Sequence, residues 1–83
     1  MDAHILAVDD NPEIREIIGI LLTGEGFAVD QAGDGTQALA MLKEKHYDLI
    51  ILDIMMPGMN GYQTCLEIRK LTNAPILFLS ART

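Results

Sequence analysis

The sequence has little cysteine and little positive charge, and each shortage excludes a class of protein. Cys65 is the only cysteine, so no disulfide can form within the chain, and His4 and His46 lack the neighbouring ligands that a zinc site needs. This cysteine usage suggests a reducing compartment. Six Lys and Arg residues against twelve Asp and Glu residues give a net charge of -6, which repels nucleic acid and anionic membranes. We therefore expect no direct contact with DNA or membrane.

The sequence also has no long uninterrupted apolar segment near its start. Charged residues interrupt the first 23 positions at Asp2, Asp9, Asp10, Glu13, Arg15 and Glu16. This spacing excludes both a signal-peptide core and a membrane span, so we predict a cytoplasmic protein. A length of 83 residues allows one domain, and 49% hydrophobic against 22% charged residues is typical of a globular chain.

Short apolar segments alternate with segments of helical periodicity. The apolar segments predict strands over residues 4–8, 27–32, 49–52 and 76–79. The periodic segments predict a helix that begins at residue 12 and is ended by Gly24, and helices over residues 36–45 and 61–71. Alternation of this kind is typical of βαβ units, which build a parallel sheet with helices on both faces. The sequence therefore predicts an α/β fold in three αβα layers.

The first predicted helix has clear end signals and one apolar stripe. Asn11 is a suitable N-cap, Pro12 suits the first helical position, and Gly24 is predicted to end the helix in a left-handed conformation. Apolar residues recur at helical spacing as Ile14, Ile17, Ile18, Leu21 and Leu22.

Acidic residues and a hydroxyl follow three of the predicted strands. Asp9 and Asp10 follow the first strand, Asp53 follows the third, and Ser80 follows the fourth. Because ligands of open α/β sheets bind at the carboxyl ends of the strands, we expect these side chains to share one rim. Carboxylates brought together repel each other, and Mg2+ with its preference for oxygen ligands would relieve that repulsion. Asp53 beside Mg2+ is then a candidate nucleophile toward a phosphoryl group.

A structural explanation competes with this one, because any single Asp after a strand is more often a helix cap or turn former. The combination of an acid pair, a single acid and a small hydroxyl at three strand ends favours a functional site.

Three segments carry a family resemblance. Ala-Val-Asp-Asp-Asn at residues 7–11, Leu-Asp-Ile-Met-Met-Pro-Gly at residues 52–58 and Pro-Ile-Leu-Phe-Leu-Ser-Ala-Arg at residues 75–82 resemble the receiver domains of bacterial response regulators. The resemblance spans the whole chain and is strongest to receivers attached to winged-helix DNA-binding domains. It implies a flavodoxin-like fold and a signalling phosphoacceptor whose only catalysis is its own phosphorylation and dephosphorylation.

The resemblance also assigns roles to residues. It implies that Asp53 is the phosphoacceptor, that Asp9 and Asp10 hold Mg2+ directly or through water, and that the main-chain carbonyl of Met55 is a further ligand. Ser80 would be the switch hydroxyl that turns toward the phosphoryl group. The implied phosphoryl donor is a sensor histidine kinase, and the implied output is transcription through a DNA-binding domain absent from this chain.

Receiver domains of this family continue beyond the residues that match here. We therefore expect residues 1–83 to form a partial receiver domain without its last α-β-α segment, and with no second domain. The missing strand normally supplies a lysine that pairs with the phosphoryl group, and Lys43, Lys45 and Lys70 lie on predicted helices that do not reach the rim. We also expect residues 75–79 to form an exposed edge that favours self-association.

Two other functions remain open. The first is an aspartyl-phosphate phosphatase of the haloacid-dehalogenase type, but such enzymes need a second Asp two residues after the nucleophile, where this sequence has Met55. The second is a receiver-like interaction module that does not turn over phosphate.

Overall fold

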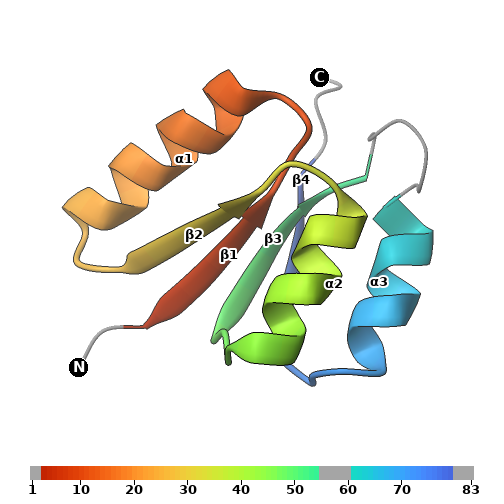
Figure 1. The fold of residues 1–83 in the computed structure, drawn as a ribbon. Helices are drawn as coiled ribbons and strands as arrows, with labels where there is room; N and C mark the ends of the chain where they lie inside the picture. Colours follow the sequence, from red (N-terminus) through yellow and green to blue (C-terminus); the bar gives the residue numbers. More distant parts are fainter. Residues whose placement is uncertain (1–2, 55–60, 80–83) are drawn as a thin grey trace.

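The computed structural model describes residues 3–54 and 61–79, in which strands and helices alternate (Figure 1). The elements are β1 (His4–Val8), α1 (Pro12–Gly24), β2 (Ala28–Ala32), α2 (Gly35–Glu44), β3 (Leu49–Asp53), α3 (Gly61–Arg69) and β4 (Ile76–Leu79). Their order confirms the βαβ pattern predicted from the sequence, and differences are confined to the ends of elements.

The strands form one parallel sheet in the order β2-β1-β3-β4. Val8 at the end of β1 pairs with Ala32 of β2 and with Leu52 of β3, while Asp53 pairs with Leu79 of β4. The connections leave β1 and β3 in opposite directions along the sheet, which makes their carboxyl ends the switch point of the fold. The residue after Val8 and the residue after Leu52 therefore meet at one rim.

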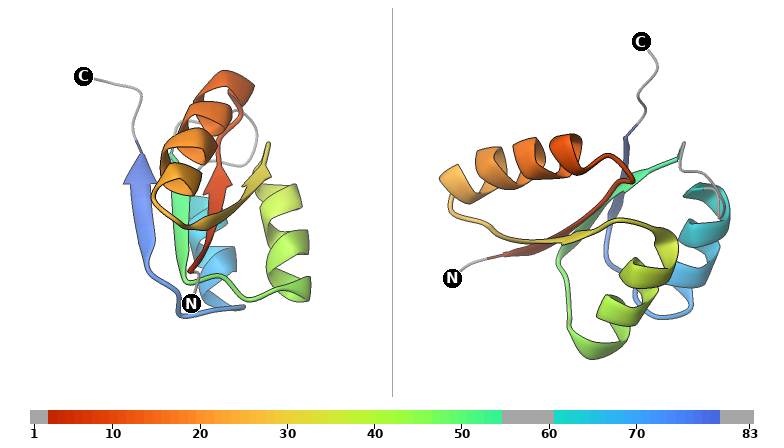
Figure 2. Two further views of the ribbon diagram at one scale, coloured as in Figure 1. Left: turned by 90° about the vertical axis from the view of Figure 1, so that its left-hand side faces the viewer. Right: turned by 45° about the horizontal axis from the view of Figure 1, so that its top comes forward.

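The helices lie on both faces of the sheet. Figures 1 and 2 show α1 alone on one face and α2 with α3 on the other. The hydrophobic core lies between the sheet and the pair α2 and α3, and consists of Leu6, Val8, Ala32, Ala38, Tyr47, Ile50, Leu52, Ile68 and Ala74. The described residues thus form the predicted three-layer αβα arrangement.

The end of α1 differs from the prediction. Gly24 belongs to the helix, and the left-handed residue is Gly26 with a φ of 96°. The amide of Gly26 donates to the carbonyl of Thr23 at 3.0 Å, and the amide of Phe27 donates to the carbonyl of Leu22 at 3.1 Å. These two bonds form a Schellman motif, which requires its left-handed residue two positions after the last helical residue. The prediction for Gly24 was therefore wrong.

The apolar stripe of α1 is only partly buried. Ile18 and Leu22 are half-buried, whereas Ile17 is 53% exposed and Leu21 is 65% exposed. The side of α1 that meets the sheet is centred on the buried Gly19, where an added β-carbon would lie 3.2 Å from the side-chain nitrogen of Gln31. The stripe is therefore wider than the contact that one helix makes with the sheet.

Within the described residues, β4 is an edge strand that pairs with β3 alone. Leu77 is 55% exposed and Phe78 is 45% exposed, and these two side chains point to opposite faces because successive residues of a strand alternate. The expected apolar edge is therefore present. No helix in residues 3–54 and 61–79 is long and apolar enough to cross a membrane.

Candidate metal and phosphoacceptor site

Three carboxylates meet at the carboxyl ends of β1 and β3. Asp9 follows β1, Asp10 follows Asp9, and Asp53 is the last residue of β3. One carboxylate oxygen from each lies within 4.8 Å of the others. Asp9 and Asp53 are each only 5% exposed, while Asp10 is exposed to solvent. The strand register therefore brings Asp53 beside Asp9 and Asp10, which precede it by more than forty positions in the sequence.

The surroundings of Asp9 disfavour its negative charge. Burial is the largest cause that raises the pKa of Asp9, and the hydrogen bond from the amide of Asn11 opposes this shift. The negative charges of Asp53 and Asp10 raise the pKa further, as does a side-chain hydrogen bond with Asp53. A bound cation would lower the pKa of Asp9 again, because an opposite charge nearby favours the ionised carboxylate.

The loop between β1 and α1 is fixed by the predicted cap. Asn11 accepts hydrogen bonds on its side-chain oxygen from the amide of Glu13 at 2.9 Å and the amide of Ile14 at 3.4 Å. Pro12 occupies the first turn, where its missing amide hydrogen leaves no partner unsatisfied. The amide of Asn11 in turn donates to the side chain of Asp9 at 2.9 Å. The helix start and the acidic site therefore share one hydrogen-bonded loop.

Arg15 also belongs to the site, although the sequence patterns did not point to it. Its Nη1 donates to the main-chain carbonyl of Asp9 at 2.6 Å. A signal existed in the sequence, since Arg15, Ile18 and Leu22 have the i, i+3, i+7 spacing of one helix face. A charged residue in phase with half-buried apolar residues indicates a specific partner.

The remaining predicted residues divide into two groups. Met55 and Ser80 lie outside the described residues. Lys45 donates to Asp30 at 3.0 Å, and Lys70 donates to Glu67 at 3.0 Å. These two lysines therefore have other partners. They lie one residue past the ends of α2 and α3, whereas the sequence predicted them within the helices, and Lys43 lies in the last turn of α2.

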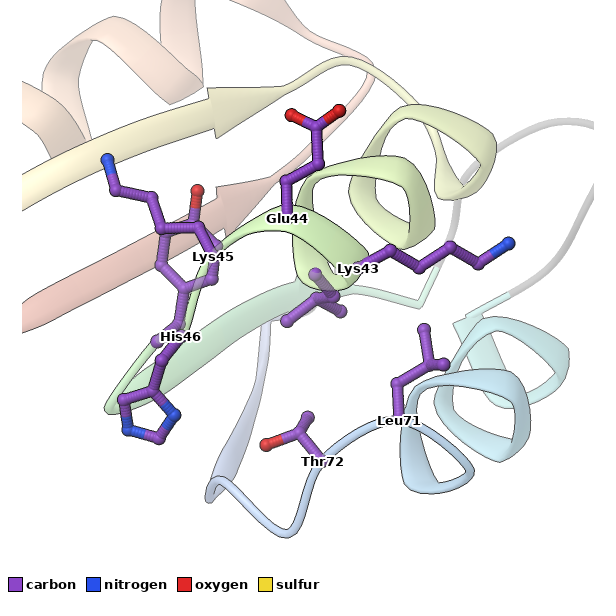
Figure 3. A pocket seen from close by; sticks show the side chains of 8 residues that line it. Lys43, Glu44, Lys45, His46, Leu71 and Thr72 are labelled. Carbon is purple, nitrogen blue, oxygen red and sulfur yellow. The ribbon is translucent and has the colours of Figure 1, made fainter.

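A separate hollow of about 330 Å³ lies at the other end of the sheet, where α2 ends and β3 begins (Figure 3). It is lined by Leu42, Lys43, Glu44, Lys45, His46, Tyr47, Leu71 and Thr72. Two of its side chains have acidic partners, because the Lys45 ammonium pairs with Asp30 and His46 Nε2 lies 3.4 Å from a carboxylate oxygen of Asp48. The hollow is thus remote from the three acids and does not contribute to their site.

Comparison with known proteins agrees with this fold. A family model described as the response regulator receiver domain matches residues 5–83. The chain therefore belongs to the response regulator receiver domain family of two-component signalling. Members of this family are signalling modules and not conventional enzymes.

Individual relatives cover the chain almost completely. The DNA-binding response regulator MtrA of Mycolicibacterium smegmatis is 46% identical over 83 residues, which is 100% of this chain and 36% of MtrA. The chain is also similar to the response regulator TrrA of Thermotoga maritima, solved in complex with Mg(2+)-BeF, at 44% identity and a TM-score of 0.90 over 98% of this chain and 71% of TrrA. A structure of the histidine kinase ThkA with TrrA matches at 44% identity and a TM-score of 0.89, over 98% of this chain and 71% of the matched chain. The chain thus spans about a third of the curated relative.

Proposed function

We propose that Asp53 accepts a phosphoryl group from a sensor histidine kinase, with Mg2+ held by the acidic site, and that this controls a transcriptional output. The observation that carries the proposal is the approach of three carboxylate oxygens to within 4.8 Å at the switch point of the sheet. The similarity to a DNA-binding response regulator and to a kinase-bound one supports the output and the donor. The DNA-binding part would lie outside these residues.

The residues present fit Mg2+. All three side chains offer oxygen, the ligand type that this ion prefers, and Mg2+ is usually held by one or two carboxylates together with water and phosphate oxygens. The side chains of Asp9 and Asp53 are buried side by side with little water to screen their repulsion, and the exposure of Asp10 leaves an approach from solvent. When bound, the ion would neutralise charge on the transferring phosphoryl oxygens. By family resemblance, the carbonyl of Met55 would be a further ligand.

Asp53 is placed to act as the nucleophile. Its position at the end of the central strand β3, between β1 and β4, holds its carboxylate at the rim. One carboxylate oxygen would form the new bond to phosphorus while the bond from phosphorus to the histidine nitrogen of the kinase breaks, and that nitrogen keeps the electron pair. Ser80 is proposed, again by resemblance, to turn its hydroxyl toward the phosphoryl group and so transmit the change.

The assignment of Asp53 is tested by mass spectrometry of the full-length gene product after incubation with acetyl phosphate and Mg2+. We expect one phosphoryl adduct, which Asp53→Asn abolishes. Asp48→Asn is the matched control, because Asp48 precedes β3 and lies at the opposite end of the same strand. An adduct that persists in Asp53→Asn would exclude Asp53 as the acceptor.

A titration separates this function from that of an interaction module without phosphoryl turnover. Beryllium fluoride with Mg2+ should stabilise a phosphoacceptor more than Mg2+ does alone, whereas a pure interaction module should show no metal-linked response. We further propose that residues 1–83 form one partial receiver domain and that the protein lies in the cytoplasm, where a histidine kinase would transfer its phosphoryl group.

We also propose that residues 1–83, taken by themselves, self-associate through β4. Its exposed Leu77 and Phe78 add apolar surface to an edge strand, and such edges favour strand pairing.

A further inference from the structure

We infer that Arg15 is a positioning residue of the acidic site, which orients the peptide unit between Asp9 and Asp10. This inference rests on the proposed metal-dependent function. It starts from the 2.6 Å hydrogen bond that Arg15 Nη1 donates to the carbonyl oxygen of Asp9. That carbonyl belongs to the planar peptide unit that joins the two acids, so its direction sets the direction in which Asp10 continues.

Among the described residues, the other hydrogen bonds of this loop hold the groups on either side of the Asp9 carbonyl, and Arg15 donates to that carbonyl. The amide of Asp9 donates to the carbonyl of Ala32 at 3.2 Å, and the side chain of Asp9 accepts from the amide of Asn11 at 2.9 Å. The carbonyl of Asn11 accepts from the amide of Arg15 at 3.1 Å. Each of these bonds fixes a neighbouring group, and the guanidinium completes the set at the peptide unit where the acid pair is joined.

The position of the guanidinium is confined from a second side. A β-carbon built on Gly33, in the loop between β2 and α2, would lie 3.3 Å from Arg15 Nη1. This distance is tighter than an ordinary contact, so the guanidinium occupies the space that the absence of a side chain at Gly33 provides. Arg15 therefore spans from α1 to two loops at the rim of the sheet.

One nitrogen of the half-buried Arg15 side chain is in an unfavourable environment. Its Nε is buried and has no hydrogen-bond partner among the described atoms. A buried polar group without a partner is unfavourable, and Met would fill the same position on the helix face without it. The hydrogen bond from Nη1 to the carbonyl of Asp9 explains why an arginine occupies this position in spite of its unpaired Nε.

The experiment compares Mg2+ affinity with stability in matched variants of the full-length gene product. Arg15→Met removes the donors and keeps the apolar stem. Arg69→Met is the control, because Arg69 Nη1 makes an equivalent bond to the carbonyl of Ala74 at 2.7 Å, at the opposite end of the sheet. Mg2+ dissociation constants are measured by calorimetric titration, and stability is measured by urea unfolding.

Both variants should lose stability, but only Arg15→Met should weaken Mg2+ binding, by about tenfold, as expected when a residue that orients metal ligands is removed. Arg15→Lys should restore part of the affinity, because it keeps one charged donor. Unchanged affinity in folded Arg15→Met overturns the inference, and if that variant does not fold, unchanged affinity in Arg15→Gln does so. Absence of Mg2+ binding by the unmodified protein would instead contradict the proposed function.

Discussion

Replacement of Gly61 by Ala is expected to be among the most damaging single-methyl changes in this protein. Gly61 begins α3 and is buried against Ile54, the residue that follows the proposed phosphoacceptor. A β-carbon at Gly61 would lie 2.3 Å from the Cα of Ile54, 2.8 Å from its Cβ and 2.9 Å from its Cγ2. Since the nearest atom is backbone, a change of side-chain rotamer cannot relieve the contact.

The size of the effect follows from these distances. The start of α3 or the end of β3 must move by about 1 Å to restore van der Waals separation in a close-packed interior. Overpacking of this kind costs about 1–3 kcal/mol, and involvement of the backbone places Gly61→Ala near 3 kcal/mol. In a domain of this size, the loss corresponds to a fall in melting temperature of roughly 12–24 °C.

Gly24→Ala is the matched control, since nothing lies within 4 Å of a β-carbon built there. Gly24 is the last helical residue of α1, so Ala should be neutral or stabilise by roughly 0.5–1 kcal/mol. Urea unfolding followed by circular dichroism measures both variants. Midpoints that give free energies of unfolding within about 0.5 kcal/mol of each other would refute the steric reasoning.

Three further predictions concern charge, burial and the sheet edge. Because the pKa of Asp9 is raised in the folded protein, ionisation of Asp9 lowers the free energy of unfolding as pH rises from about 4 through that pKa. Mg2+ binds the ionised carboxylates, so Mg2+ at ten times its Kd should add about 1.4 kcal/mol to the free energy of unfolding at pH 7 and less at pH 4. Calorimetric scans in Mg2+ or EDTA check this, and an equal response in Asp10→Ala would argue against a metal site. Tyr47→Phe removes the 2.6 Å bond to Asp30 and should cost about 1–1.5 kcal/mol in urea unfolding. The pKa of Tyr47 is raised by burial and then by Asp30, so the unmodified protein should lose stability above about pH 10, a loss that Tyr47→Phe should reduce. For residues 1–83 taken by themselves, Leu77→Lys should lower the average mass measured by light scattering, because it places a charge on the exposed edge of β4. A monomer with strongly protected β4 amides in hydrogen exchange would contradict that pairing.

The order of elements and the approach of the acids could be predicted because they depend on local patterns. Each buried strand is a short apolar segment, and a parallel sheet places all carboxyl ends at one edge. Asn11 as a cap followed by Pro12 likewise depends only on the first turn of the helix, and the structure confirms it. The roles of Met55 and Ser80 came from resemblance and stay predictions.

Only the tertiary structure decided which groups act as partners. The spacing of Arg15 with Ile18 gave no means of naming the carbonyl of Asp9 as its acceptor, because that choice depends on how α1 crosses the sheet. The exposure of Leu21 depends on the same crossing of α1 over the sheet. The left-handed residue is Gly26 because the Schellman bonds close there, and the sequence offered Gly24 and Gly26 without deciding between them. Sequence periodicity fixes the direction of a side chain around its own helix or strand, whereas the identity of its neighbour is set by register and by the distance between layers.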